Sequence, residues 1–259
     1  MLNRKHDLKI TIITVCFNSV DSIERTIQSV TGQSYKNIEY IVIDGDSTDG
    51  TKAILEKYKS VINKLISETD LGLYDAMNKG IAHSTGDIIG ILNADDIFYS
   101  SQVLEKIANF HFNNSVEASI GDIVQLRKNG KVFRAYTSAS WTVDKLRYGY
   151  MPPHPSIFLK REIFNRFGVY SLDFKIASDF ELVIRFFLVN KISWKYSNLI
   201  TTSMQLGGLS SSGFVSYKII TAEMRKALLN NGVRFSSFFI YLRFLGKIRE
   251  LLNGKTSPF

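Results

Sequence analysis

Short apolar runs alternate with amphipathic stretches along the first third of the chain. Residues 9–17 are almost wholly apolar and β-branched, a pattern typical of a strand buried on both faces of a parallel sheet. Residues 21–31 then place Ile23, Ile27 and Val30 on one helical face. The same alternation predicts strands at 38–43, 62–67 and 87–92 and helices at 49–60 and 74–83. Because it implies right-handed β-α-β crossovers, we predict an α/β fold with a mostly parallel sheet.

The pattern becomes less regular after residue 97. The predicted elements are a helix at 100–110, a hairpin of 117–126 with 131–137, a rigid extended segment at 152–155, a helix at 178–189, a strand at 192–196, a loop at 207–213, and closing helices at 214–230 and 235–252. No linker separates independent units, so we predict one mixed domain over 1–213 with a helical extension over 214–259.

Polar side chains follow each of the four predicted parallel strands. They are Asn18, then Asp44 and Asp46, then Glu68 and Asp70, and finally Asn93, Asp95 and Asp96. In open α/β sheets, ligands bind outside the carboxyl ends of the strands. We therefore expect these groups to gather around one ligand site.

The segment Asn93-Ala94-Asp95-Asp96 is a candidate cation site. Two carboxylates at the end of a buried strand repel each other and lose solvation, which is costly unless a cation or a hydrogen-bond network compensates. Mg²⁺ and Mn²⁺ prefer oxygen ligands, and Mg²⁺ often takes one or two carboxylates plus substrate phosphates. The alternative is that Asp96 caps the helix at 100–110.

Two further segments carry candidate binding residues. The loop 44–51 can accept hydrogen bonds from a nucleotide base or ribose through its acids, or it is a glycine turn in which Thr48 or Asp49 caps the next helix. On the helix at 74–83, Asp75 shares one face with Asn78 and Lys79. Lys79 can meet a phosphate there, or that face is solvated and holds an internal Asp–Lys pair.

Taken in order, strand-CFN, IDGDSTDGT, ETDLGLYDAMNKG and NADD resemble the family 2 inverting glycosyltransferases with the GT-A fold. The closest likeness is to bacterial enzymes of exopolysaccharide and cell-envelope glycan assembly. The resemblance is specific over 9–98 and weaker through HPSIFLKREIF (154–164), IASDFELVIRFF (176–187) and GGLS (207–210). It implies a Rossmann-like GT-A domain that moves one sugar from a UDP- or GDP-sugar to a glycan or polyprenyl-linked acceptor.

The resemblance also implies roles for single residues. Asp95 faces a divalent metal, Mn²⁺ or Mg²⁺, and Asp179 is the general base that deprotonates the acceptor hydroxyl. The residues expected to bind the donor are Phe17, Asp44, Asp46, Asp70, Asp75, Asn78, Lys79, Asn93, Asp95 and His154. The loop 207–210 is expected near the donor phosphates or the acceptor.

Two departures from the family pattern matter. Asn93 occupies the first position of the D-x-D element, which removes one charge from the metal site, and DGDS stands where many relatives have DDGS. No Gln-x-x-Arg-Trp element is present, so we do not expect a processive synthase.

A rival interpretation is a nucleotide-sugar-binding partner or regulator without catalysis. For Asp179, the alternative is a capping box formed by Ser178 and Glu181, in which the helix terminus favours the ionised carboxylate.

Charge is concentrated at the end of the chain. Eight Lys/Arg and two Glu give residues 214–259 a net charge of +6, which leaves +2 of the total +8 for the first 213 residues. This distribution argues against nucleic-acid binding. The helix at 235–252 is basic and amphipathic, so it either lies on an anionic membrane surface or packs on the domain. The single cysteine and the lack of a signal-like or spanning apolar segment favour the cytoplasm, with peripheral attachment to the inner face of the cell membrane as a further expectation.

Overall fold

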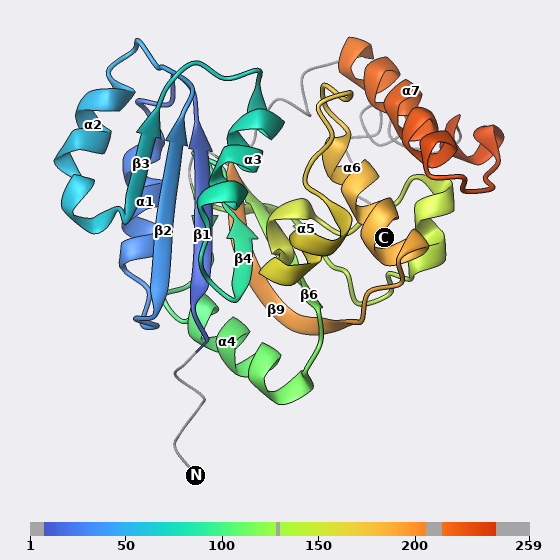
Figure 1. The fold of residues 1–259 in the computed structure, drawn as a ribbon, viewed down its shortest axis with the longest axis horizontal. Helices are drawn as coiled ribbons and strands as arrows, with labels where there is room; N and C mark the ends of the chain where they lie inside the picture. The colour runs from blue at the N-terminus through green and yellow to red at the C-terminus, as the bar shows by residue number, and fades with distance from the viewer. Residues whose placement is uncertain (1–7, 128–129, 206–213, 242–259) are drawn as a thin grey trace.

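The computed structural model describes residues 8–127, 130–205 and 214–241. Its first half is a parallel sheet in the order β3-β2-β1-β4, connected by helices (Figure 1). The elements are β1 (Ile10–Cys16), α1 (Ile23–Thr31), β2 (Ile38–Asp44), α2 (Thr51–Lys57), the 3-10 turn η2 (Lys59–Val61), β3 (Lys64–Ser67), α3 (Leu73–His83) and β4 (Ile88–Ile91). The predicted alternation is confirmed over this half.

The second half of the chain extends the same sheet with mixed strand directions. Its elements are β5 (Ile97–Phe98), α4 (Val103–Asn114), β6 (Ala118–Leu126), β7 (Val132–Tyr136), η3 (Val143–Tyr148), η4 (His154–Ser156), β8 (Ile157–Lys160), α5 (Arg161–Phe167), α6 (Ser178–Val183), the π-turn η5 (Ile184–Val189), β9 (Trp194–Gln205) and α7 (Phe214–Asn230). The hairpin of β6 and β7 is confirmed by antiparallel pairing.

Three predictions in this half were wrong or incomplete. The extended segment expected at 152–155 turns into the 3-10 helix η4 at His154. Strand β8 was not predicted, and it inserts antiparallel between β4 and β6. Strand β9 continues to Gln205, beyond the expected end at 196, because it pairs along β6 and then with β5. These features depend on contacts between segments that are distant in the chain, and the local pattern of apolar and polar residues does not predict such contacts.

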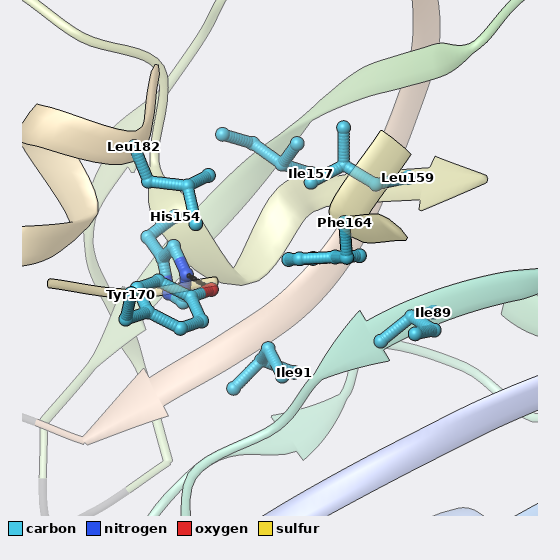
Figure 2. Close-up of a pocket in the computed structure, with 8 residues that line it drawn as sticks. All are labelled: Ile89, Ile91, His154, Ile157, Leu159, Phe164, Tyr170 and Leu182. Carbon is cyan, nitrogen blue, oxygen red and sulfur yellow. Dashed lines mark hydrogen bonds between the residues drawn. The ribbon is translucent and has the colours of Figure 1, made fainter. Parts of the chain in front are cut away.

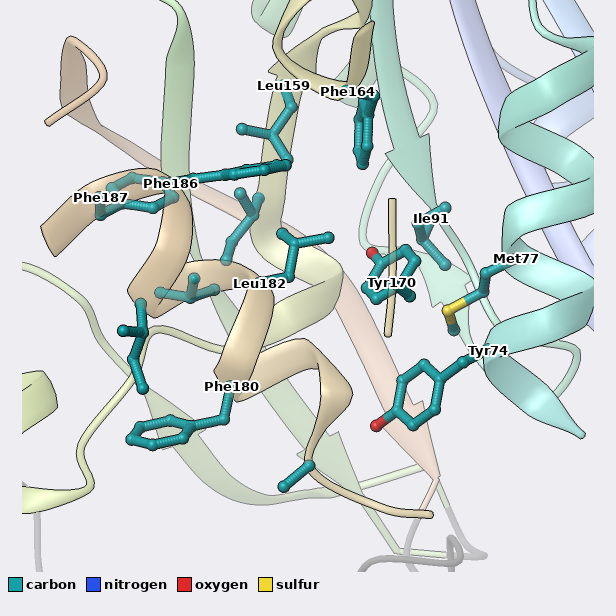
Figure 3. Close-up of a cluster of buried hydrophobic side chains, with 14 of the residues drawn as sticks. Tyr74, Met77, Ile91, Leu159, Phe164, Tyr170, Phe180, Leu182, Phe186 and Phe187 are labelled. Carbon is teal, nitrogen blue, oxygen red and sulfur yellow. The ribbon is translucent and has the colours of Figure 1, made fainter. Parts of the chain in front are cut away.

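Two hydrophobic layers hold the helices against the sheet. One face of the sheet packs against α3, α5, α6 and α7, and the other against α1, α2 and α4. Alternate residues of β1 serve the two layers, with Ile13 in the first and Ile12 in the second. Figure 3 shows the first layer, where Tyr74 and Met77 of α3 approach Ile91 of β4 and Tyr170. Both faces are therefore buried, as the unbroken apolar strands predict.

The sheet curls back on itself. Strands β4 and β5 are only five residues apart in sequence, yet they stand at the two ends of the path β4-β8-β6-β9-β5. A connection of that length spans at most about 20 Å, so the far end of the sheet must return toward β4. The connecting turn is residues 92–96, the acidic segment singled out above. The fold thus places that segment where the two ends of the curl meet.

Helix α7 packs on the domain. Its residues Ile220, Met224, Ala227 and Leu228 belong to the same hydrophobic layer as α6. Residues 237–241 are helical, and the remainder of the helix predicted at 235–252 lies outside the described residues. Among the described residues, no helix combines the length and the apolar character needed to cross a bilayer.

Candidate active site

The carboxyl ends of β1 and β2 meet the loop after β3 in close contact. A Cβ added at Gly45 would stand 2.6 Å from Asp70 Oδ2 and 3.4 Å from a ring carbon of Phe17, so these three residues share one small region. The ring of Phe17 is 63% exposed, although large apolar side chains are normally buried. An exposed ring beside a carboxylate at a strand end offers a flat apolar surface and a hydrogen-bond acceptor to a ligand.

Asp44 lies at the end of β2 and is fully buried. Its carboxylate accepts hydrogen bonds from Ser47 and from Ser67 Oγ at 2.6 Å, and Cys16 Sγ lies 3.6 Å away. Burial of a carboxylate is tolerated when several donors satisfy it. Asp44 therefore fixes the loop after β2, and it links that loop to the end of β3.

The other acids of the loop 44–51 face outward or serve the next helix. Asp46 has a left-handed backbone (φ 66°) and forms an exposed ion pair with Lys52. Asp49 accepts the Thr51 N–H at the start of α2 and also the Val20 N–H after β1. Gly50, and not Thr48 or Asp49, occupies the cap position of α2, and Asp49 bonds the first helical residue from outside and ties two loops at the site together.

The polar face of α3 is satisfied by the protein itself. Lys79 Nζ lies 2.8 Å from Glu68 and 3.6 Å from Asp75. The side chain of Asn78 bonds the backbone of Tyr170 in both directions, donating to its carbonyl at 2.8 Å and accepting from its N–H at 2.9 Å. Asn78 therefore anchors the loop that carries Tyr170 to α3.

The turn between β4 and β5 holds a buried acid and a buried amide oxygen that lack partners. Asp96 is fully buried, and neither of its carboxylate oxygens has a hydrogen-bond partner; Asn93 Oδ1 is in the same condition. Burial, reinforced by the charge of Asp95, raises the pKa of Asp96 well above its ordinary value. Thr26 Oγ1 of α1 lies 2.8 Å from Ala94 O and 2.7 Å from Asp96 O, which secures the turn.

The capping alternative for Asp96 is wrong. Helix α4 begins at Val103 with Gln102 as its cap residue, well beyond Asp96. A buried carboxylate without partners is costly, and a bound cation is one way to offset the cost. In the described part of the chain, no group of three or more His, Cys, Asp or Glu is arranged to hold a metal. The oxygens of Asn93, Asp95 and Asp96 nevertheless suit a hard divalent ion that takes its other ligands from phosphate and water.

Asp179 stands at the start of α6 among aromatic side chains. Its Oδ1 accepts the Phe180 N–H at 2.8 Å and lies 3.4 Å from the hydroxyl of Tyr74. Burial raises the pKa of the Asp179 carboxyl above its ordinary value, while His154 acts in the opposite direction. The expected preference for the ionised form is therefore outweighed by desolvation, which gives a stronger base.

The predicted capping box at α6 is absent. Ala177 occupies the cap position, and the helix begins at Ser178. The hydroxyl of Ser178 donates to Ser171 O at 2.7 Å, and Glu181 forms an ion pair with Arg185 at 2.9 Å. Neither side chain caps the helix, so the position of Asp179 has to be set by other contacts.

His154 and two tyrosines complete this aromatic cluster. His154 Nε2 lies 2.6 Å from the hydroxyl of Tyr170, whose ring stacks on Tyr74 at 5.6 Å. Figure 2 shows His154 and Tyr170 at one end of a cavity whose remaining lining is apolar. That cavity measures about 10 Å³, which is room for about one water and not for a sugar. Burial lowers the pKa of His154, so its ring is neutral at neutral pH.

Sequence reasoning selected some of these residues and missed others. Phe17 and Asp70 meet at Gly45, and His154 joins Asp179 in the aromatic cluster, whereas Asn78 and Lys79 are engaged within the protein. Residues 207–210, expected near the phosphates or acceptor, lie outside the described residues. The missed residues are Tyr74, Tyr170 and Asp96 in its buried state. Tyr74 lies within the motif ETDLGLYDAMNKG, where the helical spacing indicates only a buried core position. Tyr170 lies outside every motif named above.

Comparison with known proteins agrees with this architecture. Residues 11–178 match the model of Glycosyl transferase family 2. The chain is 34% identical over 182 residues to an uncharacterized glycosyltransferase of Mycobacterium tuberculosis, which covers 70% of this chain and 69% of the relative. It is 28% identical over 207 residues to a PGL/p-HBAD biosynthesis glycosyltransferase of Mycobacterium bovis, with 78% and 79% covered.

Two solved structures share the fold. S. aureus TarS 1-349 in complex with UDP-GlcNAc superposes with a TM-score of 0.67 at 19% identity, covering 90% of this chain and 70% of that one. The mannosyltransferase PcManGT from Pyrobaculum calidifontis, in complex with GDP-Man and Mn²⁺, gives 0.62 at 17% identity, covering 94% and 81%. These likenesses establish the GT-A architecture of the curled sheet. With a family model that spans most of the sequence, the chain belongs to glycosyltransferase family 2 and is a glycosyltransferase.

Proposed function

We propose that this enzyme transfers one sugar from a nucleotide-diphosphate donor to an acceptor hydroxyl with inversion at the anomeric carbon. The observation that carries the proposal is the pairing of two sites along one edge of the sheet. The ends of β1 to β4 bring Phe17, Asp70 and Asp95 to that edge, and Asp179 lies in a desolvated aromatic cluster beside α3. A donor site next to a carboxylate base is what a single displacement at a sugar carbon requires.

The nucleotide end of the donor would occupy the region around Gly45. The exposed ring of Phe17 can stack on a base, and the carboxylates of Asp46 and Asp70 can accept hydrogen bonds from base or ribose groups. Asp44 supports this region from beneath, because its carboxylate is occupied by Ser47 and Ser67. Both structural relatives named above were solved with nucleotide-sugars, which supports a donor of this class here.

The diphosphate would lie toward the turn 93–96, where Asn93, Asp95 and Asp96 would hold a divalent metal. Such an ion, when bound, supplies charge stabilisation for the departing diphosphate. The chain's own contribution is the fixed backbone of this turn, which Thr26 Oγ1 holds through the carbonyls of Ala94 and Asp96. The Mn²⁺ in the PcManGT complex supports the choice of metal class.

Proton transfer would be the task of Asp179. As the acceptor oxygen forms its bond to the anomeric carbon and the bond to the diphosphate breaks, the acceptor's proton passes to the Asp179 carboxylate. Attack from the face opposite the leaving group inverts the anomeric centre. Burial among these neighbours raises the pKa of Asp179, while the charge of His154 and the hydrogen bond from Tyr74 act in the opposite direction.

The acceptor is proposed to be a glycan or a polyprenyl-linked sugar, met at the inner face of the cell membrane. The support for a membrane location is an aromatic surface at the end of the described chain, where Phe238 is 65% and Tyr241 48% exposed, with Arg225 over the ring of Tyr241. Interfacial helices combine such rings with Lys and Arg. Ile240, on another side of this helix, is buried in the domain, so the described turn packs on the domain while presenting these rings.

The test is a panel of UDP-glucose, UDP-N-acetylglucosamine and GDP-mannose, each with and without Mn²⁺. A true donor raises the melting temperature with Mn²⁺ by mass action, and it is hydrolysed slowly when water replaces the acceptor. A purely binding protein would show the thermal shift with no nucleotide release. Absence of both effects for all three donors would contradict the donor class proposed here.

A further inference from the structure

The loop that leads into Asp179 is held by a residue of the C-terminal helix. Glu223 of α7 accepts three successive backbone N–H groups, from Lys175 at 2.8 Å and from Ile176 and Ala177 at 2.9 Å each. Its two oxygens divide these bonds, with Lys175 on Oε1 and the others on Oε2. One carboxylate thereby fixes the three residues immediately before α6.

The same loop is held from its other side by α3. The hydroxyl of Tyr74 donates to Ile176 O at 2.5 Å, so the Ile176 residue is bonded through its N–H to α7 and through its carbonyl to α3. Lys226, one turn after Glu223, donates to Asp173 O at 2.9 Å and lies over the ring of Phe174. The segment 173–177 is therefore held between α3, which lies beside the donor site, and α7, which follows later in the chain.

This clamp lies directly before Asp179. Ala177 is the cap residue of α6, and Asp179 is the second residue of that helix. Side-chain capping does not secure this helix start, and Glu223 holds more of its backbone N–H groups than any other described side chain. Hydrogen bonds to a charged acceptor are about twice as strong as neutral ones. Misplacing a reacting group by about 1 Å can cost about 100-fold in rate.

We propose that Glu223 is a positioning residue, which places the Asp179 carboxylate by binding the backbone N–H groups of 175–177 and so makes α7 a working part of the catalytic domain. The proposal rests on the proposed role of Asp179 as the base. It extends that role to a helix which the sequence assigned to an extension beyond the domain.

Glu117 provides a matched control. Its carboxylate also accepts a backbone N–H, from Ser193 at 2.6 Å, and pairs with Arg166 at 2.7 Å. Glu117 directly precedes β6, and its carbonyl accepts the N–H of Lys160. Lys160 pairs with Ile88 at the start of β4, so Glu117 lies at the edge of the sheet opposite the site. Replacing Glu117 therefore removes a comparable structural clamp without touching the loop before α6.

The experiment compares Glu223→Gln with Glu117→Gln in Mn²⁺-dependent hydrolysis of the best donor from the panel above, together with their melting temperatures. Glutamine keeps one acceptor oxygen and places an NH₂ group against backbone donors. We expect kcat of Glu223→Gln to fall by at least about tenfold with donor KM nearly unchanged, because positioning errors act on the reacting group. Glu117→Gln should lose thermal stability alone.

Chemical rescue separates positioning from general loosening. In Glu223→Ala, added formate can occupy the three N–H groups and should restore kcat in a saturable manner, whereas Glu117→Ala should not respond. If Glu223→Gln does not fold, Glu223→Asp, which shortens the side chain by one methylene, is measured under the same criteria.

The outcomes distinguish this inference from the function beneath it. A folded Glu223 variant with wild-type kcat, or equal kcat losses in the Glu223 and Glu117 variants, overturns the positioning role while the large kcat loss of Asp179→Asn still supports the base. Full turnover in Asp179→Asn would instead overturn the assignment of the base, and the positioning proposal with it.

Discussion

Replacing Asp179 by asparagine isolates the proton-accepting role. In the wild type, Oδ1 accepts the Phe180 N–H and lies near the Tyr74 hydroxyl. On the proposed mechanism, Oδ2 is the carboxylate oxygen that takes the acceptor's proton. Asparagine has the same shape and can keep the Oδ1 contacts, but its NH₂ group at the Oδ2 position cannot accept a proton.

The expected loss follows from that single change. A positioned general base contributes about 10²- to 10⁴-fold, so kcat of Asp179→Asn should fall by that factor, or about 3–5 kcal/mol in activation free energy. Donor KM should stay close to that of the wild type, because Phe17, Gly45 and Asp70 belong to other elements of the fold. The assay is nucleotide release at saturating donor, with the exposed Asp144→Asn as the control for loss of a carboxylate.

The pH dependence gives a second measurement on the same residue. Burial raises the pKa of Asp179, and the base acts only when ionised, so kcat/KM should fall as pH drops through a value above the ordinary aspartate pKa of about 3.9. This acidic limb should be missing from the residual activity of Asp179→Asn. Turnover of the variant within about threefold of the wild type, with its acidic limb intact, would refute the assignment.

Three further predictions address the donor site, the acidic turn and the membrane surface. Gly45→Ala sets a methyl 2.6 Å from Asp70 Oδ2 and should raise donor KM roughly tenfold, since overpacking costs about 1–3 kcal/mol; an unchanged KM would separate Asp70 from donor binding. Asp96→Asn removes a buried carboxylate without partners, so it should raise the melting temperature of the apo enzyme but reduce its Mn²⁺-dependent shift with UDP; calorimetry showing neither effect would contradict this reasoning. Phe238→Ser should weaken flotation with anionic liposomes at unchanged melting temperature, and equal flotation of variant and wild type would argue against a membrane role for this ring.

The first half of the fold was accessible from sequence because its signals are local. Strands β1, β2 and β4 are mostly apolar runs, and an acid or amide that marks the site edge stands at the end of each or within two residues after it. Strand β8 has only four residues, and its place is set by Phe158, whose ring lies against Gly90 of β4. That contact joins segments far apart in the chain, so no local sequence pattern predicts it.

The site was predicted unevenly for the same reason. Motif residues such as Asp70 and Asp95 stand out by spacing, but burial of Asp96 is visible only once the curl encloses the turn. Tyr170 and Glu223 act through backbone contacts with α3 and the loop before α6. Their side chains carry no signature, since any loop tyrosine or helical glutamate would look alike in the sequence.

The curl of the sheet limits where this chain can tolerate inserted or deleted residues. The five residues between β4 and β5 bridge the two ends of the strand path, and Thr26 of α1 fastens them from behind. An added or deleted residue there would shift the register of β5 on β9 and swing the acids out of place together. Insertions should therefore be rejected at 92–96, while the tip of the β6–β7 hairpin, which closes no such bridge, should accept them.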